Sequence, residues 1–178
     1  MSFDEASTIL VKSCVQPSRI LDVGTGRGTA AFKASKLLDG RGQIVGLDVS
    51  TTALREARLR RAREGMPPVE FLRGCGERLP FQDQTFDVVI SSFGLAHFRD
   101  PSTALREMIR VLKARGRIGI ADFRHPTHVE VHPVFRSANL EMIINWISER
   151  LRAYGCRGVR VVYSRRDFFV VTAVKGDT

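Results

Sequence analysis

The chain has 178 residues, 43% of them hydrophobic, which is enough to bury the core of one domain without disulfides or a structural metal. Its longest apolar runs are far shorter than the roughly 20 residues of a membrane span, no secretion signal opens it, and its three cysteines include no Cys-x-x-Cys pair, so we expect a cytoplasmic protein with reduced thiols. The formal net charge of +9 is compatible with nucleic acid, an anionic membrane surface or acidic small substrates, and does not choose among them.

Short β-branched runs alternate with helical patterns along the chain, which predicts parallel strands joined by helices. The predicted strands are 19–23, 43–48, 69–72, 86–91, 117–122, 159–163 and 168–174. The predicted helices are 4–13, 29–38, the segment between Ser50 and Gly65, the segment from Pro101 to Leu112, and 140–151.

The last two predicted strands are separated by the short polar turn 164–167, which cannot hold a right-handed crossover, so they should form an antiparallel hairpin. We therefore predict a three-layer α/β/α sandwich around a seven-stranded, mostly parallel sheet that ends in this hairpin. No linker or internal repeat interrupts the sequence, so we expect a single domain over residues 1–178, with residues 1–18 as a short amino-terminal cap.

A glycine loop, Gly24-Thr25-Gly26-Arg27-Gly28, follows the first predicted strand and precedes a helix. A backbone that turns tightly against a ligand requires glycine, because a Cβ atom would fill the space. By itself such a loop also fits the pyrophosphate of NAD, whose fingerprint is G-x-G-x-x-G with an acidic residue roughly 20 positions later, where Asp48 stands.

Two details favour S-adenosylmethionine over NAD. The spacing is G-x-G-x-G, and Asp22 precedes the loop, where its charge would oppose a pyrophosphate but attract the ammonium group of S-adenosylmethionine. Asp48, at the end of the second predicted strand, would accept hydrogen bonds from the ribose hydroxyls. A turn for Asp22 and a helix cap for Asp48 are the alternative roles, although both acids stand at strand ends where open α/β sheets bind ligands.

Two further segments make the pattern more specific: residues 74–89, GCGERLPFQDQTFDVV, and residues 105–113, LREMIRVLK, followed by Gly116. With the glycine loop, they resemble motifs of the class I S-adenosylmethionine-dependent methyltransferases, in the branch that includes the ubiquinone and menaquinone biosynthesis methyltransferases. The resemblance is close over residues 19–123 and looser after Asn139. It implies a Rossmann-like fold and S-adenosylmethionine as the cofactor, released as S-adenosylhomocysteine.

Carried over by position, the resemblance also implies which residues bind each part of the cofactor. The residues for the methionine end are Asp22, Gly24, Thr25, Gly26 and Gly28; those for the ribose and adenine are Asp48 and Val49; those for the adenine edge are Gly76 and Glu77; and those below the sulfonium are Ser92 and Phe93. Relatives commonly have an acidic residue at Cys75, which would contact the adenine amino group. Cysteine is a weak acceptor, so cofactor affinity should be lower unless Glu77 or a backbone carbonyl compensates.

Methyl transfer from a sulfonium is a direct displacement, so the protein mainly has to hold the acceptor, the methyl carbon and the sulfur in line. A hydroxyl or carbon acid acceptor also needs a base, and His97, beyond the fourth predicted strand, is the candidate catalytic residue; shaping the pocket or capping a helix is its alternative role. His125, His128 and His132 lie in a proline-bearing segment with one nearby acid, so we expect a substrate-contacting loop and no metal site.

The branch resemblance favours a small or lipid-like acceptor. An RNA or protein acceptor is compatible with the positive charge. Methyltransferases of this fold that act on amino groups of nucleic acids tend to have an Asn-Pro-Pro-Tyr type of motif after the fourth strand. Residues 91–94 are Ser-Ser-Phe-Gly, so no motif supports a nucleic acid acceptor. Only 18 residues precede Arg19, so we expect an open cleft, covered by a bulky acceptor or by a second subunit, for example in a homodimer. A non-catalytic or partner-dependent cofactor-binding module and a nicotinamide oxidoreductase are the competing functions.

Overall fold

A computed structural model describes residues 3–14, 16, 18–123, 131–136, 139–165 and 168–177. The described strands form one seven-stranded sheet, and the bounds of these strands are β1 (Arg19–Val23), β2 (Gln43–Asp48), β3 (Glu70–Arg73), β4 (Phe86–Ser92), β5 (Leu112–Phe123), β6 (Cys156–Arg165) and β7 (Phe168–Lys175). The bounds of the helices are α1 (Phe3–Cys14), α2 (Thr29–Leu37), α3 (Thr51–Glu64), α4 (Pro101–Val111) and α5 (Leu140–Ala153), with short 3₁₀ helices η1 (Leu95–His97) and η2 (Pro133–Arg136).

The strand order is β3-β2-β1-β4-β5-β7-β6. Strands β1 to β5 are parallel to one another, whereas β7 is antiparallel to both β5 and β6. This confirms the Rossmann-like sandwich, the mostly parallel sheet and the antiparallel hairpin at the end of the chain. The change of direction in β7 divides the sheet into a parallel part and a smaller antiparallel part.

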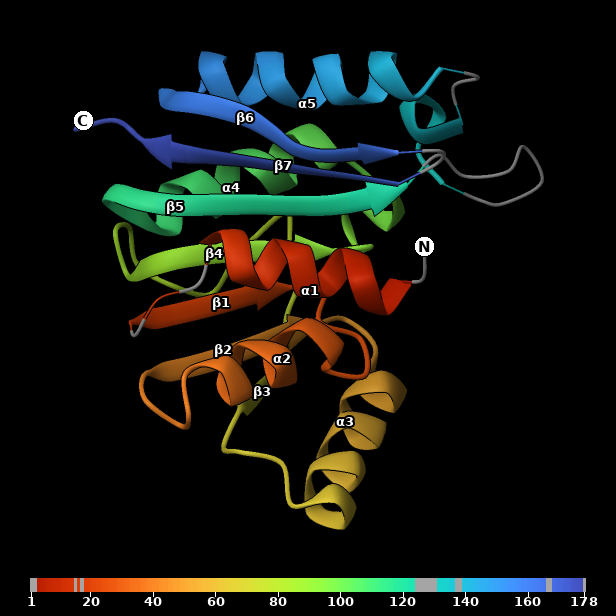
Figure 1. The fold of residues 1–178 in the computed structure, drawn as a ribbon, viewed down its shortest axis with the longest axis vertical. Coiled ribbons are helices and arrows are strands. Elements are labelled where there is room, and N and C mark those ends of the chain that lie inside the picture. The colour runs from red at the N-terminus through yellow and green to blue at the C-terminus, as the bar shows by residue number, and fades with distance from the viewer. Residues whose placement is uncertain are drawn as a thin grey trace.

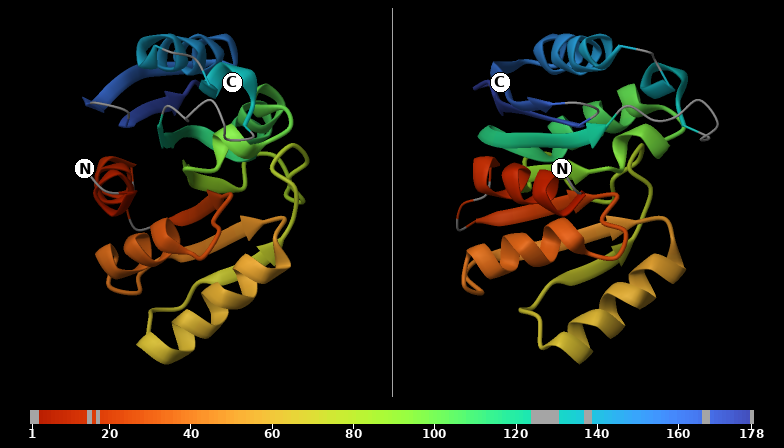
Figure 2. Two further views of the ribbon diagram at one scale, coloured as in Figure 1. Left: turned by 90° about the vertical axis from the view of Figure 1, so that its right-hand side faces the viewer. Right: turned by 45° about the vertical axis from the view of Figure 1, so that its right-hand side comes forward.

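Helices cover both faces of the sheet (Figures 1 and 2). Alternation along the strands separates two cores: Ile20 packs with α1 and α2 on one face, whereas Leu21 packs with α4 and α5 on the other. The same alternation directs Asp22 toward the face of α1 and α2. In Figure 1 no helix lies in front of β6 on the α1 face.

Local signals mark several helix ends where the sequence predicted them. The Ser50 side chain accepts from the Ala53 N–H at the start of α3, and Gly65 ends that helix in the left-handed conformation. Asp100 accepts from the Ser102 and Thr103 N–H groups at the start of α4, with Pro101 as the first helical residue. These ends agree with the sequence because capping depends only on neighbouring residues.

The strands near the antiparallel part extend beyond their predicted limits. Strand β5 begins at Leu112, which pairs with Phe86, and not at Arg117, because a bulge lets the segment after α4 rejoin the ladder. Strand β6 covers 156–165 and not only 159–163, because pairing with β7 continues through two register shifts. Such extensions are set by pairing between distant segments, which local residue patterns do not reveal.

Candidate functional site

The carboxyl ends of β1, β2 and β4 border a cleft with two lobes, which share Gly24, Gly26 and Phe93. The first, here called the apolar lobe, encloses about 270 Å³ and is lined by Gly24, Gly26, Leu47, Asp48, Val49, Gly74, Gly76, Phe93, Gly94, His97 and Phe98. The second, here called the acid lobe, encloses about 200 Å³ and is lined by Ser7, Asp22, Gly24, Thr25, Gly26, Thr29, Ala30, Ser92 and Phe93. Ligand pockets usually hold roughly 300–1,000 Å³, so a cofactor-sized molecule would need both lobes.

Asp48 fastens the glycine loop between the two lobes. Its Oδ2 accepts from the Gly26 N–H at 2.8 Å, and its Oδ1 accepts from the Ser50 N–H at 2.8 Å. Each carboxylate oxygen can accept a second hydrogen bond, so the side chain can hold the loop and still receive a pair of ligand hydroxyls. The alternative role of Asp48 as a helix cap is wrong, because the N-cap of α3 is Ser50. Asp48 instead holds the glycine loop, and this role is compatible with binding a ligand.

Asp22 lies in the acid lobe and is 1% exposed. Its Oδ2 accepts from the Thr25 hydroxyl at 2.7 Å, whereas its Oδ1 is buried without a hydrogen-bond partner among the described residues. Burial raises the pKa of this carboxyl to about 6, against the lowering effect of the Thr25 hydroxyl and of the nearby Ala31 backbone N–H, with which no hydrogen bond is formed. A buried acceptor without a donor costs free energy, so this lobe suits a cationic, hydrogen-bonding ligand.

Gly26 and Gly28 have different roles although both adopt the left-handed conformation, with φ of +53° and +79°. A Cβ atom on Gly26 would meet nothing within 4 Å and would project from a residue that lines both lobes. A Cβ atom on Gly28 would lie 2.8 Å from Phe32 and 2.9 Å from Phe71, at the start of α2. Gly28 therefore permits the packing of α2, and it lines neither lobe.

Cys75 and Glu77 form a local bridge outside the lining of the lobes. The Cys75 thiol donates to Glu77 Oε2 at 2.8 Å, and Glu77 Oε1 accepts from the Arg99 N–H at 2.8 Å. Both carboxylate oxygens of Glu77 are thus engaged, and the side chain ties the β3–β4 connection to the segment before α4. Gly76, between them, lines the apolar lobe beneath the Phe98 ring.

Phe93 follows β4 and borders both lobes in a conformation that bulky residues rarely adopt, with φ of +60°. Its N–H donates to the Ala121 carbonyl at 2.8 Å, which holds the turn against β5. The Phe93 ring lies 5.9 Å from the Phe123 ring and 6.0 Å from the Phe168 ring, measured between centroids. These three rings are here called the aromatic wall: Phe93 lines the cleft, and Phe123, at the end of β5, and Phe168, at the start of β7, pack beside it.

His97 is exposed and lines the apolar lobe at the end of η1. The 3₁₀ helix is held by the buried Asp122, whose Oδ2 accepts from the Ala96 N–H at 3.2 Å. The Ala96 carbonyl in turn accepts from the His132 N–H at 3.0 Å. His97 is therefore positioned at the mouth of the cleft by a carboxylate that the sequence interpretation missed.

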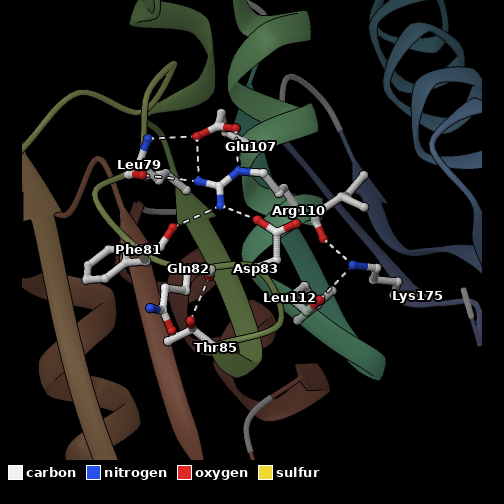
Figure 3. Close-up of polar contacts among 10 residues, drawn as sticks. Leu79, Phe81, Gln82, Asp83, Thr85, Glu107, Arg110, Leu112 and Lys175 are labelled. Carbon is white, nitrogen blue, oxygen red and sulfur yellow. Dashed lines mark hydrogen bonds and ion pairs between the residues drawn. The ribbon is translucent and has the colours of Figure 1, made fainter.

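Arg110 in α4 fixes the connection between β3 and β4 (Figure 3). Its guanidinium donates to the Leu79 and Phe81 carbonyls at 3.1 and 2.9 Å and to Asp83 and Glu107. Glu107 also accepts from the Leu79 N–H at 2.9 Å. Because this connection begins with the glycines that line the apolar lobe, α4 supports the cleft from outside.

The metal hypothesis concerned three histidines, of which His125 and His128 lie outside the described residues. His132 is described, and its N–H contacts the Ala96 carbonyl. Within the part of the chain that the structure describes, no group of three or more His, Cys, Asp or Glu side chains could hold a metal ion. Among the described helices, none is long and apolar enough to cross a membrane.

The structure adds lining residues that the sequence interpretation did not name. In the apolar lobe these are Leu47, Gly74, Gly94 and Phe98. In the acid lobe they are Ser7, Thr29 and Ala30. Ser7 contacts Ser92 through their hydroxyls at 2.9 Å, so the short helix α1 forms a wall of the acid lobe. No local sequence signal marks Ser7, because it meets a residue 85 positions away.

Comparisons with known proteins agree with this geometry. The family described as the ubiE/COQ5 methyltransferase family matches residues 4–145 of the chain. The "Ubiquinone/menaquinone biosynthesis C-methyltransferase UbiE" of Pseudomonas fluorescens (strain SBW25) is 37% identical over 119 residues, which cover 66% of this chain and 46% of that protein. The "2-methoxy-6-polyprenyl-1,4-benzoquinol methylase, mitochondrial" of Leishmania donovani is 35% identical over 133 residues, with the same coverage of 66% and 46%.

A solved structure of an S-adenosylmethionine-dependent methyltransferase from Aquifex aeolicus has the same fold, with a TM-score of 0.76, 24% identity, and coverage of 94% of this chain and 88% of that chain. The chain spans just under half the length of the curated relatives named above. The family match covers most of the chain, including both lobes of the cleft. The chain belongs to the ubiE/COQ5 methyltransferase family.

Proposed function

We propose that the chain binds S-adenosylmethionine in the two-lobed cleft and transfers its methyl group to a small, lipid-like acceptor of the quinol class. One observation carries the cofactor assignment: the buried Asp22 lines the acid lobe, and its Oδ1 has no hydrogen-bond partner among the described residues. The ammonium group of the methionine end would supply the missing donor and the opposite charge.

The apolar lobe fits the other end of the cofactor. Asp48 presents two carboxylate oxygens beside Val49, which is 59% exposed at the rim, and Leu47 and Phe98 provide apolar contact area. In this assignment Asp48 binds the ribose hydroxyls and the apolar side chains enclose the adenine. Because Glu77 lines neither lobe and its carboxylate accepts from the Cys75 thiol and the Arg99 N–H, we assign recognition of the adenine amino group to backbone carbonyls at the lobe.

The acceptor would lie against the aromatic wall. Phe93 borders both lobes, where the proposed cofactor would place its sulfonium, and the Phe123 and Phe168 rings pack against Phe93. The two relatives are named for a polyprenyl benzoquinol methylase and for ubiquinone and menaquinone biosynthesis, and an aromatic ring with an apolar tail is complementary to such a wall. The cofactor supplies an activated methyl group, and the protein holds the acceptor in line with it.

We assign His97 the role of the base that removes a proton from the acceptor. Its imidazole lies at the mouth of the apolar lobe, and histidine is the side chain that most often serves as a general base in enzymes. Asp122 acts through the η1 backbone and is a positioning residue.

The decisive experiment is a calorimetric titration of the chain with S-adenosylhomocysteine, with Asp48→Ala and the charge-matched Asp177→Ala as variants. Asp177 is exposed and pairs with Arg115, away from the cleft. We expect one-site binding that weakens about 100-fold in Asp48→Ala, equivalent to ~3 kcal/mol for two lost charge-assisted hydrogen bonds, and that is unchanged in Asp177→Ala. Transfer of a labelled methyl group to a demethylated quinol then tests the acceptor.

The same titration separates the alternatives. Binding of NAD in preference to S-adenosylhomocysteine would contradict the cofactor assignment. Binding that requires a second chain would indicate a partner-dependent module. Methylation of RNA or protein without methylation of the quinol would overturn the acceptor assignment and keep the cofactor.

A further inference from the structure

A second hollow lies on the face of the sheet that α1 covers only in part. It encloses about 250 Å³ and is lined by Ser13, Cys14, Arg117, Gly158, Arg160, Thr172, Ala173 and Val174. Neither the proposed cofactor binding nor the proposed methyl transfer uses these residues. The lining includes two arginines and no carboxylate.

Strand pairing brings the two arginines together from opposite sides of β7. Arg117 in β5 pairs with Val174, and Arg160 in β6 pairs with Thr172, two positions away on the same strand. Directly paired residues of antiparallel strands project from the same face, and so do residues two apart. Arg117, Thr172, Val174 and Arg160 therefore share one face, and their side chains surround one hollow.

The arginine and threonine side-chain donors that line the hollow have no protein acceptor among the described residues. Within the described ranges, Arg117, Arg160 and the Thr172 hydroxyl have no hydrogen bond or ion pair. Two other arginines are different: Arg115 pairs with Asp177 at 2.6 Å, and Arg110 is engaged by Asp83 and Glu107. The hollow thus concentrates uncompensated positive charge, which the +9 charge of the chain reinforces.

The floor of the hollow is neutral. Cys14 is 1% exposed, and burial raises the pKa of its thiol to about 12, so it carries no charge that would repel an anion. Gly158 adopts a left-handed conformation at the bulge of β6, and a Cβ atom there would meet nothing within 4 Å, so the β6 side of the hollow is not filled by a side chain at this position.

We propose that this hollow, here called the arginine hollow, binds a phosphate or diphosphate group, with Arg117 and Arg160 contacting its oxygens and the Thr172 hydroxyl as a third donor. Guanidinium groups match phosphate geometry through paired N–H donors, which makes arginine well suited to this ligand. A lipid headgroup and a soluble phosphate compound both have this chemistry.

The arginine hollow is separate from the cofactor cleft. Ser7 of α1 lines the acid lobe, whereas Ser13 of the same helix lines the hollow. Six residues of α-helix correspond to about 9 Å along the axis. The two sites therefore lie toward opposite ends of α1, and this inference does not depend on the proposed methyl transfer.

The test is a calorimetric titration with inorganic pyrophosphate at low ionic strength, using the double variant Arg117→Gln/Arg160→Gln. The matched control is Arg55→Gln/Arg63→Gln, which removes the same charge from exposed positions of α3. We expect saturable binding that weakens at least about tenfold in the first variant and less than about twofold in the control. Circular dichroism and thermal melting establish that both variants are folded.

A parallel arm identifies the source of the phosphate group. Sedimentation with vesicles of phosphatidylcholine containing phosphatidic acid is compared with sedimentation with phosphatidylcholine alone. Retention that requires phosphatidic acid and is lost in Arg117→Gln/Arg160→Gln supports a lipid headgroup, whereas pyrophosphate binding without vesicle retention supports a soluble ligand. Absence of both, or an equal loss in both double variants, overturns the proposal.

Discussion

The two ends of α1 lie beside two differently built sites. At one end, Ser7 borders a cleft whose charged lining residues, Asp22 and Asp48, are acidic. At the other end, Ser13 borders a hollow whose charged lining residues, Arg117 and Arg160, are basic. The first is formed by loops that follow parallel strands, and the second by the pairing of antiparallel strands.

This difference shows how one sheet can separate two kinds of ligand. In the cleft, one oxygen of a buried carboxylate has no donor among the described residues, so the site favours a cation with N–H groups. In the hollow, two arginines on an open face have no acceptor in the described part of the chain, so the site favours an anion. If the two sites are independent, a change in one should leave ligand binding at the other unchanged.

The largest effect should come from adding a methyl group at two of the three loop glycines, Gly26 and Gly28. Gly28→Ala introduces both a left-handed alanine and a clash with Phe32 and Phe71, so we expect a loss of about 3 kcal/mol in the free energy of unfolding. Gly26→Ala should cost only about 1 kcal/mol of stability but weaken S-adenosylhomocysteine binding about thirtyfold. Denaturant unfolding and calorimetry measure the two quantities.

Pyrophosphate binding serves as the control, because neither glycine lines the arginine hollow. A Gly28→Ala protein as stable as the wild type would contradict the packing role of Gly28. A Gly26→Ala protein with full affinity for S-adenosylhomocysteine would show that the ligand does not approach the loop.

A smaller, pH-dependent effect should separate the two sites. Burial raises the pKa of Asp22 to about 6, so a cationic ligand that requires the carboxylate should lose about tenfold in affinity for each pH unit below 6. Asp22→Asn should bind weakly at every pH and lose this dependence. Calorimetry between pH 5 and 8 measures how the affinity for S-adenosylhomocysteine depends on pH, with Asp177→Asn as the control. If Asp22→Asn keeps the pH dependence of the wild type, a group other than Asp22 takes up the proton.

The same group also affects the stability of the unliganded chain. Because the folded-state pKa of Asp22 is raised, the folded chain binds this proton more tightly than the unfolded chain between about pH 4 and 6. Its contribution to stability is therefore greatest below this window and declines as the pH rises through it. In Asp22→Asn, the free energy of unfolding plotted against pH should lack this decline.

The smallest effect should be that of salt. Exposed charges are screened over about 10 Å at 0.1 M ionic strength, whereas buried charges are screened much less. Raising the ionic strength from about 0.05 to 0.5 M should weaken pyrophosphate binding roughly fivefold and S-adenosylhomocysteine binding less than about twofold. Equal salt dependence of the two titrations would indicate that both ligands occupy sites of the same kind.

Much of the fold could be predicted because its signals are local. Strands β1 and β2 have their predicted limits, and α3 begins after Ser50 and ends at Gly65, where a side-chain acceptor and a left-handed glycine mark its ends. The acids and glycines of the cleft follow strand ends that parallel pairing brings to one edge. Their convergence therefore follows from the fold class alone.

Other parts of the site could not be predicted from local patterns. Ser7 enters the acid lobe only because α1 packs beside Ser92, and Asp122 positions His97 only because β5 ends beneath η1. Glu77 lies in a segment that resembles a motif for adenine contact, but its carboxylate accepts from the Cys75 thiol and the Arg99 N–H. Each depends on which distant segment lies next to the residue.

The sequence by itself determined the alternation of strands and helices, the direction of the last hairpin, the glycine loop and the two acids, because periodicity, capping and turn chemistry act between neighbouring residues. Only the tertiary structure decided that β7 lies between β5 and β6, that Asp22 Oδ1 is left without a partner, and that Arg117 and Arg160 line one hollow. Strand order and register are set by the sum of contacts between distant segments, and no single stretch of sequence specifies that sum.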